Sequence, residues 1–124
     1  MLKTINKIKI SEAATYRLRQ LKGKTGLTPN ILARFAFCHS INISGIPNPK
    51  EYDLEGMEFN RYTLNGPHDT LIISLLLLRM EEDNLPIEYV HDYFRAHICR
   101  GTMEIFPRVK TLLDLQNLIP SLIS

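Results

Sequence analysis

The stretch from His68 to Asp83 constrains the fold more than any other part of the chain, because it predicts a helix without a polar face. Its apolar residues cover every side of such a helix: Leu71, Ile72, Ile73, Leu75, Leu76, Leu77 and Leu78. That run is eight residues long, whereas a bilayer span needs roughly 20. A chain of 124 residues is expected to be one domain, and in a domain this small such a helix usually packs against a second copy. We therefore predict a helical domain that forms a homo-oligomer.

The beginning of the chain predicts a strand followed by a helix. Residues 3–10 alternate lysine with other residues, which places Lys7 and Lys9 on one face of an extended strand. Ser11 is a suitable N-cap for a helix over residues 12–22. The exposed faces of this helix would carry basic side chains.

Two glycines predict that this first helix ends in a turn over residues 23–26, which would carry Lys24. Thr28 followed by Pro29 is a strong start signal, because proline needs no hydrogen-bond partner at the first helical position. The second helix, over residues 29–40, is apolar nearly all round, so we expect it to be central or to lie at an interface.

The rest of the chain predicts a loop region and further helices. Within residues 44–67, the segment 58–64 alternates in a way that fits a short strand or an ordered loop. A helix is expected over residues 87–99, ended by Gly101, and a last one after Pro107.

The charge of the chain is unevenly divided. Residues 1–50 hold nine basic side chains and one acid, a net charge of +8, and residues 51–124 hold six basic and twelve acidic side chains, a net charge of −6. Such an asymmetry indicates a polyanion partner for the first half. We divide the single domain into a basic strand-helix-helix unit over 1–43, a loop and short-strand region over 44–67, and a helical oligomerisation half over 68–118.

Six basic side chains are the candidate DNA contacts, through phosphate neutralisation: Lys7, Lys9, Arg17, Arg19, Lys22 and Lys24. Lys7 and Lys9 could enter a DNA groove if two copies paired their strands into a ribbon, or they could protect an edge strand from aggregation. Tyr16 and Tyr62 are candidates for stacking on an exposed base, although packing is the commoner role of such aromatics.

Four segments of the sequence resemble one known family, in the same order along the chain. They are RLRQLKGKTGLTPNILARFAFC over 17–38, GIPNP over 45–49, EFNRYTLNG over 58–66 and DYFRAHICRG over 92–101. This pattern is similar to that of DndE, the small component of the DNA phosphorothioation, or sulfur modification, system. The resemblance covers almost the whole chain, and the residues beyond Val109 are its least distinctive part.

The resemblance implies a mostly helical fold whose strand-helix-helix start is similar to ribbon-helix-helix DNA-binding proteins, and a homotetramer. It also implies a DNA-binding component that prefers nicked duplex and acts with DndC, DndD and a cysteine desulfurase to replace a non-bridging phosphate oxygen by sulfur. The family's basic DNA-contacting surface would correspond to Arg17, Arg19, Lys22 and Lys24.

The residues give little support for catalysis by the chain itself. No Walker phosphate-binding pattern is present, and the spacing of the histidines and cysteines matches no zinc pattern. We expect no cofactor, no metal and no catalytic residue. Two alternatives remain: a metal-dependent nickase using Asp53, Glu55 and Glu58, and a protein-only assembly scaffold. The N-terminus lacks the apolar region of a secretory signal, so we expect a cytoplasmic protein with reduced cysteines.

Overall fold

The computed structural model describes residues 5–123, with side chains as far as Leu118. Within these residues there are two short strands, β1 (Lys7–Lys9) and β2 (Glu58–Asn60). The α-helices of the described residues are α1 (Glu12–Thr25), α2 (Pro29–Ile41), α3 (Arg61–Asn65), α4 (Asp69–Glu82), α5 (Val90–Ile105) and α6 (Leu112–Ile123). Four single 3-10 turns connect them: η2 (Pro49–Glu51), η3 (Gly66–His68), η4 (Ile87–Tyr89) and η5 (Phe106–Arg108). The predicted class, a mostly α domain with a strand-helix-helix start, is confirmed.

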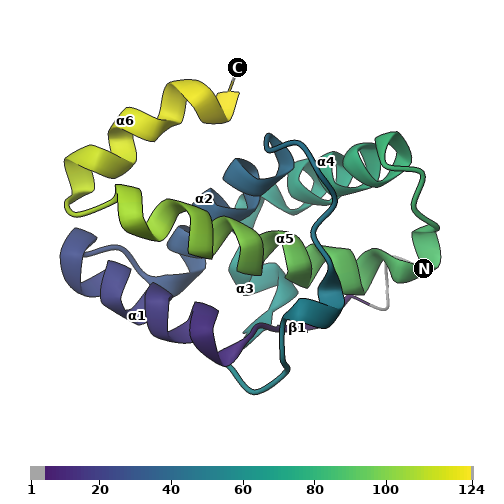
Figure 1. Ribbon diagram of the computed structural model, residues 1–124, viewed down its shortest axis with the longest axis horizontal. Coiled ribbons are helices and arrows are strands. Elements are labelled where there is room, and N and C mark those ends of the chain that lie inside the picture. Colours follow the sequence, from purple (N-terminus) through teal and green to yellow (C-terminus); the bar gives the residue numbers. More distant parts are fainter. Residues whose placement is uncertain (1–4, 124) are drawn as a thin grey trace.

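Helices α2 and α5 form the centre of the molecule, with α1 beside them at one end, α4 at the other and α6 above (Figure 1). The prediction that the second helix is central is thus confirmed. Its Phe37 packs edge-on against Phe94 of α5, with ring centroids 5.4 Å apart. Both side chains are fully buried, so the two helices share the core.

Gly101 lies inside α5, where it permits the close approach of α2. A Cβ atom at this position would lie 1.8 Å from the main-chain oxygen of Ala36. The expectation that Gly101 ends a helix is therefore wrong, and α5 continues to Ile105. Close packing of backbone against backbone, not helix termination, explains this glycine.

Helix α1 also continues past its expected end. It begins as predicted, with the Ser11 side chain accepting a hydrogen bond from the Ala14 amide, but it runs to Thr25 and ends at Gly26. Gly26 has φ +78°, the left-handed conformation that favours glycine. The predicted glycine turn over 23–26 is thus wrong, because Gly23 and Lys24 are part of the helix.

Strands β1 and β2 pair antiparallel, with Lys7 opposite Asn60 and Lys9 opposite Glu58. The other edge of β1 is also occupied: the Lys7 carbonyl lies 2.8 Å from His91 Nε2, and the Lys9 carbonyl accepts a hydrogen bond from Arg95 Nε. Because α5 caps that edge, this structure leaves no room for pairing β1 with the same strand of a second copy. Residues 3 and 4 of the predicted strand lie outside the described residues.

The segment 58–64 divides into two elements where one was expected. Its first three residues form β2, and α3 then begins because the Asn60 side chain accepts hydrogen bonds from the Tyr62 and Thr63 amides. Asn60 is therefore both the last strand residue and the N-cap of the next helix.

Candidate nucleic-acid interface

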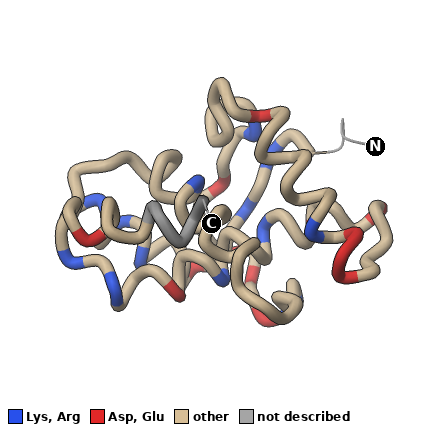
Figure 2. The backbone as a smooth tube through the Cα atoms, turned by 90° about the horizontal axis from the view of Figure 1, so that it is seen from above, with Lys and Arg blue, Asp and Glu red and all other residues tan. Residues whose placement is uncertain are grey.

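The C-terminal end of α1 carries a group of cations that an aromatic ring holds together. The Arg17 guanidinium carbon and the Lys24 ammonium nitrogen each lie 4.5 Å from the centroid of the Phe106 ring. Phe106 belongs to η5, so this contact brings Arg108 and Lys110 to the same end of the molecule. Figure 2 shows lysines and arginines gathered there, at the opposite end from the acidic run that finishes α4.

We call this group the basic end; it comprises Arg17, Lys22, Lys24, Arg108 and Lys110. Sequence reasoning missed the last two members, because nothing local indicates that residues 108–110 fold back against α1. Arg108 has an acidic neighbour, Glu104, at 3.9 Å, but both side chains are about half exposed, 54% and 46%. A pair so exposed to water leaves most of the arginine's charge available.

Lys22 and Lys24 also stabilise the helix that carries them. They lie in the last turn of α1, and Glu12 lies in its first turn. Each charge thus complements the nearby end of the helix dipole. Both lysines are exposed, so this role leaves their ammonium groups free to meet a phosphate from solvent.

The strand lysines, Lys7 and Lys9, lie at the other end of α1. Both are exposed on the outer face of the two-stranded sheet, and Lys9 has an acidic cross-strand neighbour, Glu58. Helix α1 has 14 residues, which corresponds to a length of about 20 Å. The structure therefore does not bring the six predicted DNA contacts into one patch, because the strand lysines are separated from Lys22 and Lys24 by the length of α1.

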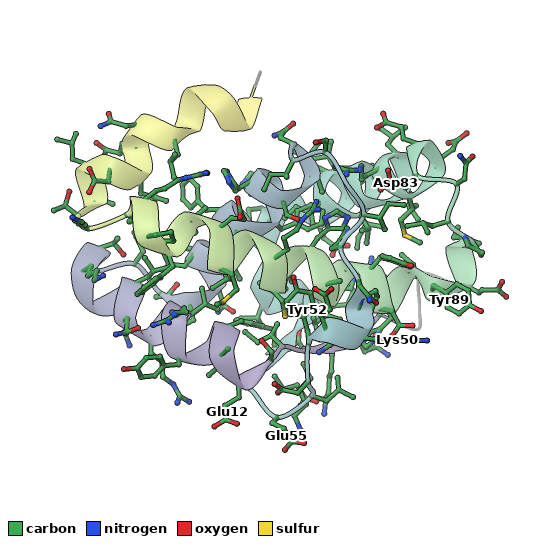
Figure 3. All side chains as sticks on the ribbon, viewed as in Figure 1. Glu12, Lys50, Tyr52, Glu55, Asp83 and Tyr89 are labelled. Atoms are coloured by element: carbon green, nitrogen blue, oxygen red, sulfur yellow. The ribbon has the colours of Figure 1, made fainter. Side chains whose placement is uncertain are left out.

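Arg19 has a different environment from the other candidates. It lines a groove of about 420 Å³ between the start of α1 and the loop before β2, together with Glu12 and Glu55. Figure 3 labels these two glutamates, which lie at the lower edge of the molecule. With two carboxylates in the same groove, Arg19 is the least suited of the six to hold a phosphate.

Most other arginines of the chain bind its own backbone. Arg95 is 3% exposed and donates hydrogen bonds to the carbonyls of Lys9, Pro49, Tyr52 and Asp53. Arg79, Arg100 and Arg34 likewise bind main-chain carbonyls of distant segments. These arginines add to the net charge of the chain, but their guanidinium groups are bound to its own carbonyls and offer little surface to a ligand. The exposed cations are therefore mainly lysines.

Arg61 is held in a buried ion pair. Its Nη2 lies 2.9 Å from Asp69 Oδ2, and its side chain is 7% exposed. The hydrogen bond from Arg61 lowers the pKa of Asp69, and Asp69 in turn raises the pKa of Arg61. Asp69 thus links α3 to the start of α4.

The nickase alternative requires the carboxylates of Asp53, Glu55 and Glu58 to lie together, but the structure gives Asp53 a structural role and places Glu58 on a strand. Asp53 Oδ1 accepts hydrogen bonds from the amides of Glu12 and Glu55, both at 2.9 Å, and the first of these is the main cause of its lowered pKa. Asp53 therefore caps the start of α1. Glu58 is on β2 and faces Lys9. Within residues 5–123, no group of three or more His, Cys, Asp or Glu side chains is placed to hold a metal ion.

His97 is a buried histidine whose pKa is far below the ordinary value. Burial, and next the charge of Arg100, lowers its pKa to about 3. Its Nδ1 lies 2.8 Å from Ser40 Oγ, and its Nε2 has no hydrogen-bond partner. The side chain is completely buried, so this serine–histidine pair has no access to a substrate and acts in the core.

The fold and its surface together define a small helical protein with a strand-helix-helix start and a basic end. The model of the family "DndE: DNA sulphur modification protein DndE" matches residues 7–111. The chain therefore belongs to the DndE family, and the resemblance stated from the sequence is confirmed.

Solved structures agree with this assignment. The chain is 27% identical to DndE from Escherichia coli B7A, described as involved in DNA phosphorothioation modification, with a TM-score of 0.67 over 81% of this chain and 95% of that one. A mutant of DndE, 23% identical, has the same fold, with a TM-score of 0.65 over 81% of this chain and 96% of that one. Curated protein sequences give no significant match.

Helix α6 lies beyond the segment that the family model matches, which ends at Thr111. Its Leu115 is buried against the core, and Leu118 packs there too. Leu112 and Leu113 are exposed. None of the helices in the described part of the chain combines the length and hydropathy needed to cross a membrane.

Proposed function

We propose that this chain is the DNA-binding component of a DNA phosphorothioation machinery, and that it holds duplex DNA, nicked duplex above all, against α1. The observation that carries the proposal is that Lys22 and Lys24 are exposed and, in the part of the chain that the structure describes, not neutralised by a neighbouring carboxylate. Both are exposed, and neither takes part in an ion pair among residues 5–123, where the ion-paired arginines are Arg61, Arg79 and Arg108. Lysines in that state release counterions when they meet phosphates.

The spacing of the cations supports a backbone-tracking mode of binding. The strand lysines and the basic end are separated by the length of α1, about 20 Å, which corresponds to roughly six base pairs of duplex. A nick allows the duplex to bend at one point, so that phosphates on its two sides can approach both ends of the helix. Contacts of this kind position the protein without reading sequence.

In this proposal the chain carries out no chemical step and acts in the cytoplasm as one part of an assembly. Sulfur insertion belongs to DndC, DndD and the cysteine desulfurase, and the chain presents DNA to them as a homotetramer. The exposed face of α4 supports self-assembly, since Leu71 and Leu78 are each 57% exposed and Leu75 is half-buried. The acidic residues that follow them, Glu81 and Glu82, are a candidate surface for the partner proteins.

The decisive experiment is a titration of intact and nicked duplexes at several salt concentrations. We expect K22E/K24E to bind both duplexes more weakly and to flatten the salt dependence, by a slope of about 1.8 if each lysine neutralises one phosphate. The matched control is E81Q/E82Q, which removes two charges from the opposite end and should leave the affinity and the slope close to those of the unmodified protein.

Three results would contradict the proposal. Unchanged affinity and slope in K22E/K24E would remove the basic end from the interface. Absence of binding to naked DNA at physiological salt would favour the protein-only scaffold. Nicking of supercoiled plasmid that depends on added magnesium, and that disappears in D53A/E55A/E58A, would favour the enzymatic alternative.

A further inference from the structure

A pocket lined by tyrosines lies on a part of the surface that neither the sequence analysis nor the proposed function uses. It has a volume of about 560 Å³, within the range of roughly 300–1,000 Å³ that small-molecule sites occupy. Tyr52, Tyr89, Tyr93 and Leu54 supply its apolar walls. Figure 3 labels Tyr52 and Lys50 on the loop that precedes β2, and Tyr89 at η4.

The walls of this pocket are fixed by the buried Arg95. From α5, its guanidinium reaches the carbonyl of Pro49 at 3.3 Å and that of Tyr52 at 2.9 Å. The same side chain binds the Lys9 carbonyl at 2.8 Å, so one residue joins the loop, the helix and β1. The pocket therefore exists before a ligand arrives, which reduces the entropic cost of binding.

The polar side chains of the pocket suit two different groups of a nucleotide, its phosphate and its base. Lys50 and Asp92 both line it, and both are exposed. An ammonium group suits a phosphate, and a carboxylate accepts hydrogen bonds from the exocyclic amino groups of bases. Aromatic side chains beside them provide faces on which a base can stack.

Lys7 and Lys9, the strand lysines, add positive charge next to the pocket. The contacts of α5 with the carbonyls of Lys7 and Lys9 place β1 directly beside the helix that carries Asp92 and Tyr93. A DNA strand that crosses β1 therefore passes close to the opening of the pocket.

We propose that this pocket binds one unstacked nucleobase of the DNA, with the tyrosines against the faces of the base, Asp92 accepting from its amino edge, and Lys50 on a flanking phosphate. This inference rests on the proposed DNA-binding function and specifies which feature of a nicked or distorted duplex the protein holds. An aromatic side chain of a partner protein would use the tyrosines but would leave the lysines around the opening without a role.

The test compares three duplexes: a continuous one, one with a single unpaired adenine, and one with an abasic residue at the same unpaired position. We expect the unmodified protein to bind the unpaired adenine at least about fivefold more tightly than the abasic site, the low end of what one base–aromatic stack contributes. Y89A should lose this preference and keep its affinity for continuous duplex. Tyr89 is 49% exposed, so the substitution should spare the fold, which thermal unfolding checks.

The matched control is Y62A, since Tyr62 is 58% exposed on α3, outside the pocket, and is itself a candidate for stacking. It should keep the preference. Equal binding of the adenine and abasic duplexes by the unmodified protein would overturn the proposal and leave the pocket to a protein side chain. A preference lost in Y62A but kept in Y89A would overturn it as well. Failure of the DNA-binding function itself would be distinguishable, because none of the three duplexes would then bind.

Discussion

Arginine and lysine have different tasks in this chain. Five planar donors allow an arginine to bind several carbonyls at once, and Arg95 does so with four main-chain carbonyls, one of β1 and three of the loop over residues 49–53. A lysine ammonium is a compact, strongly hydrated charge, and Lys22 and Lys24 remain in solvent. A count of charges in the sequence cannot separate these two roles, because the carbonyls that Arg34, Arg79, Arg95 and Arg100 bind lie 29 or more residues away, as Thr63 does from Arg34.

His97 gives the stability of the protein a predictable pH dependence. Its pKa is lowered to about 3 in the folded protein, whereas the unfolded chain has an ordinary histidine pKa of about 6.5. Below pH 6.5 the unfolded state therefore binds a proton that the folded state excludes, so stability decreases as the pH falls. The slope should approach 1.4 kcal/mol per pH unit between about pH 6 and pH 4.5.

Urea unfolding of the unmodified protein and of H97N across this pH range measures the effect. The variant should be less stable at pH 7 but should lose most of the slope, because the group that titrates is gone. H39N is the matched control, since the pKa of His39 is lowered too but that side chain is 9% exposed, whereas His97 is completely buried. An identical slope in H97N would show that the buried imidazole does not control acid stability.

At the scale of the elements, the helix starts marked by local caps were predictable, whereas the two helix ends assigned to glycines were not. Ser11 and Pro29 act locally, through caps and first-turn geometry, so the sequence identifies both starts. Gly23 and Gly101 were wrongly expected to end helices. A glycine can have several structural roles, and its neighbours in space decide which role applies. Nothing lies within 4 Å of a Cβ atom built at Gly23, whereas the α2 backbone lies against Gly101.

The two glycines should therefore respond in opposite ways to the same substitution. We expect G23A to raise the free energy of unfolding by about 0.5–1 kcal/mol, because alanine is the better helix former at an open position. G101A should lower it by about 3 kcal/mol or more, because α2 and α5 must move apart to admit the methyl group. Denaturant titration of both variants measures this, and destabilisation by G23A or tolerance of G101A would contradict the assigned roles.

At the scale of the whole molecule, the uneven charge of the sequence corresponds to a separation of basic and acidic side chains in space. The basic end and the acidic C-terminus of α4 lie at opposite ends of the molecule (Figure 2). The lysines could be identified from the sequence, but the contribution of Arg108 and Lys110 depends on Phe106 packing against α1. The tyrosine pocket was not predictable either, because its walls come from residues about 40 positions apart in the chain.

In the proposed assembly, the exposed face of α4 is the surface through which the copies contact one another. Leu71 and Leu78 lie on the same side of the helix, seven residues apart, and both are 57% exposed. Burying each leucine is worth about 1.5–3 kcal/mol, so L71D/L78D should convert an oligomer to monomers at micromolar concentration, as sedimentation velocity would detect. The matched control is L113D, since Leu113 is 63% exposed but lies on α6.

Loss of assembly should also change DNA binding, although neither leucine is part of the basic end. Monomers present one set of cations per molecule, whereas an oligomer that binds one duplex through several subunits releases counterions from each of them. We therefore expect L71D/L78D to have a shallower salt dependence than the unmodified protein, with unchanged helicity by circular dichroism. An unchanged oligomer in L71D/L78D, or dissociation in L113D, would place the interface elsewhere; dissociation with an unchanged salt slope would mean that each copy binds DNA on its own.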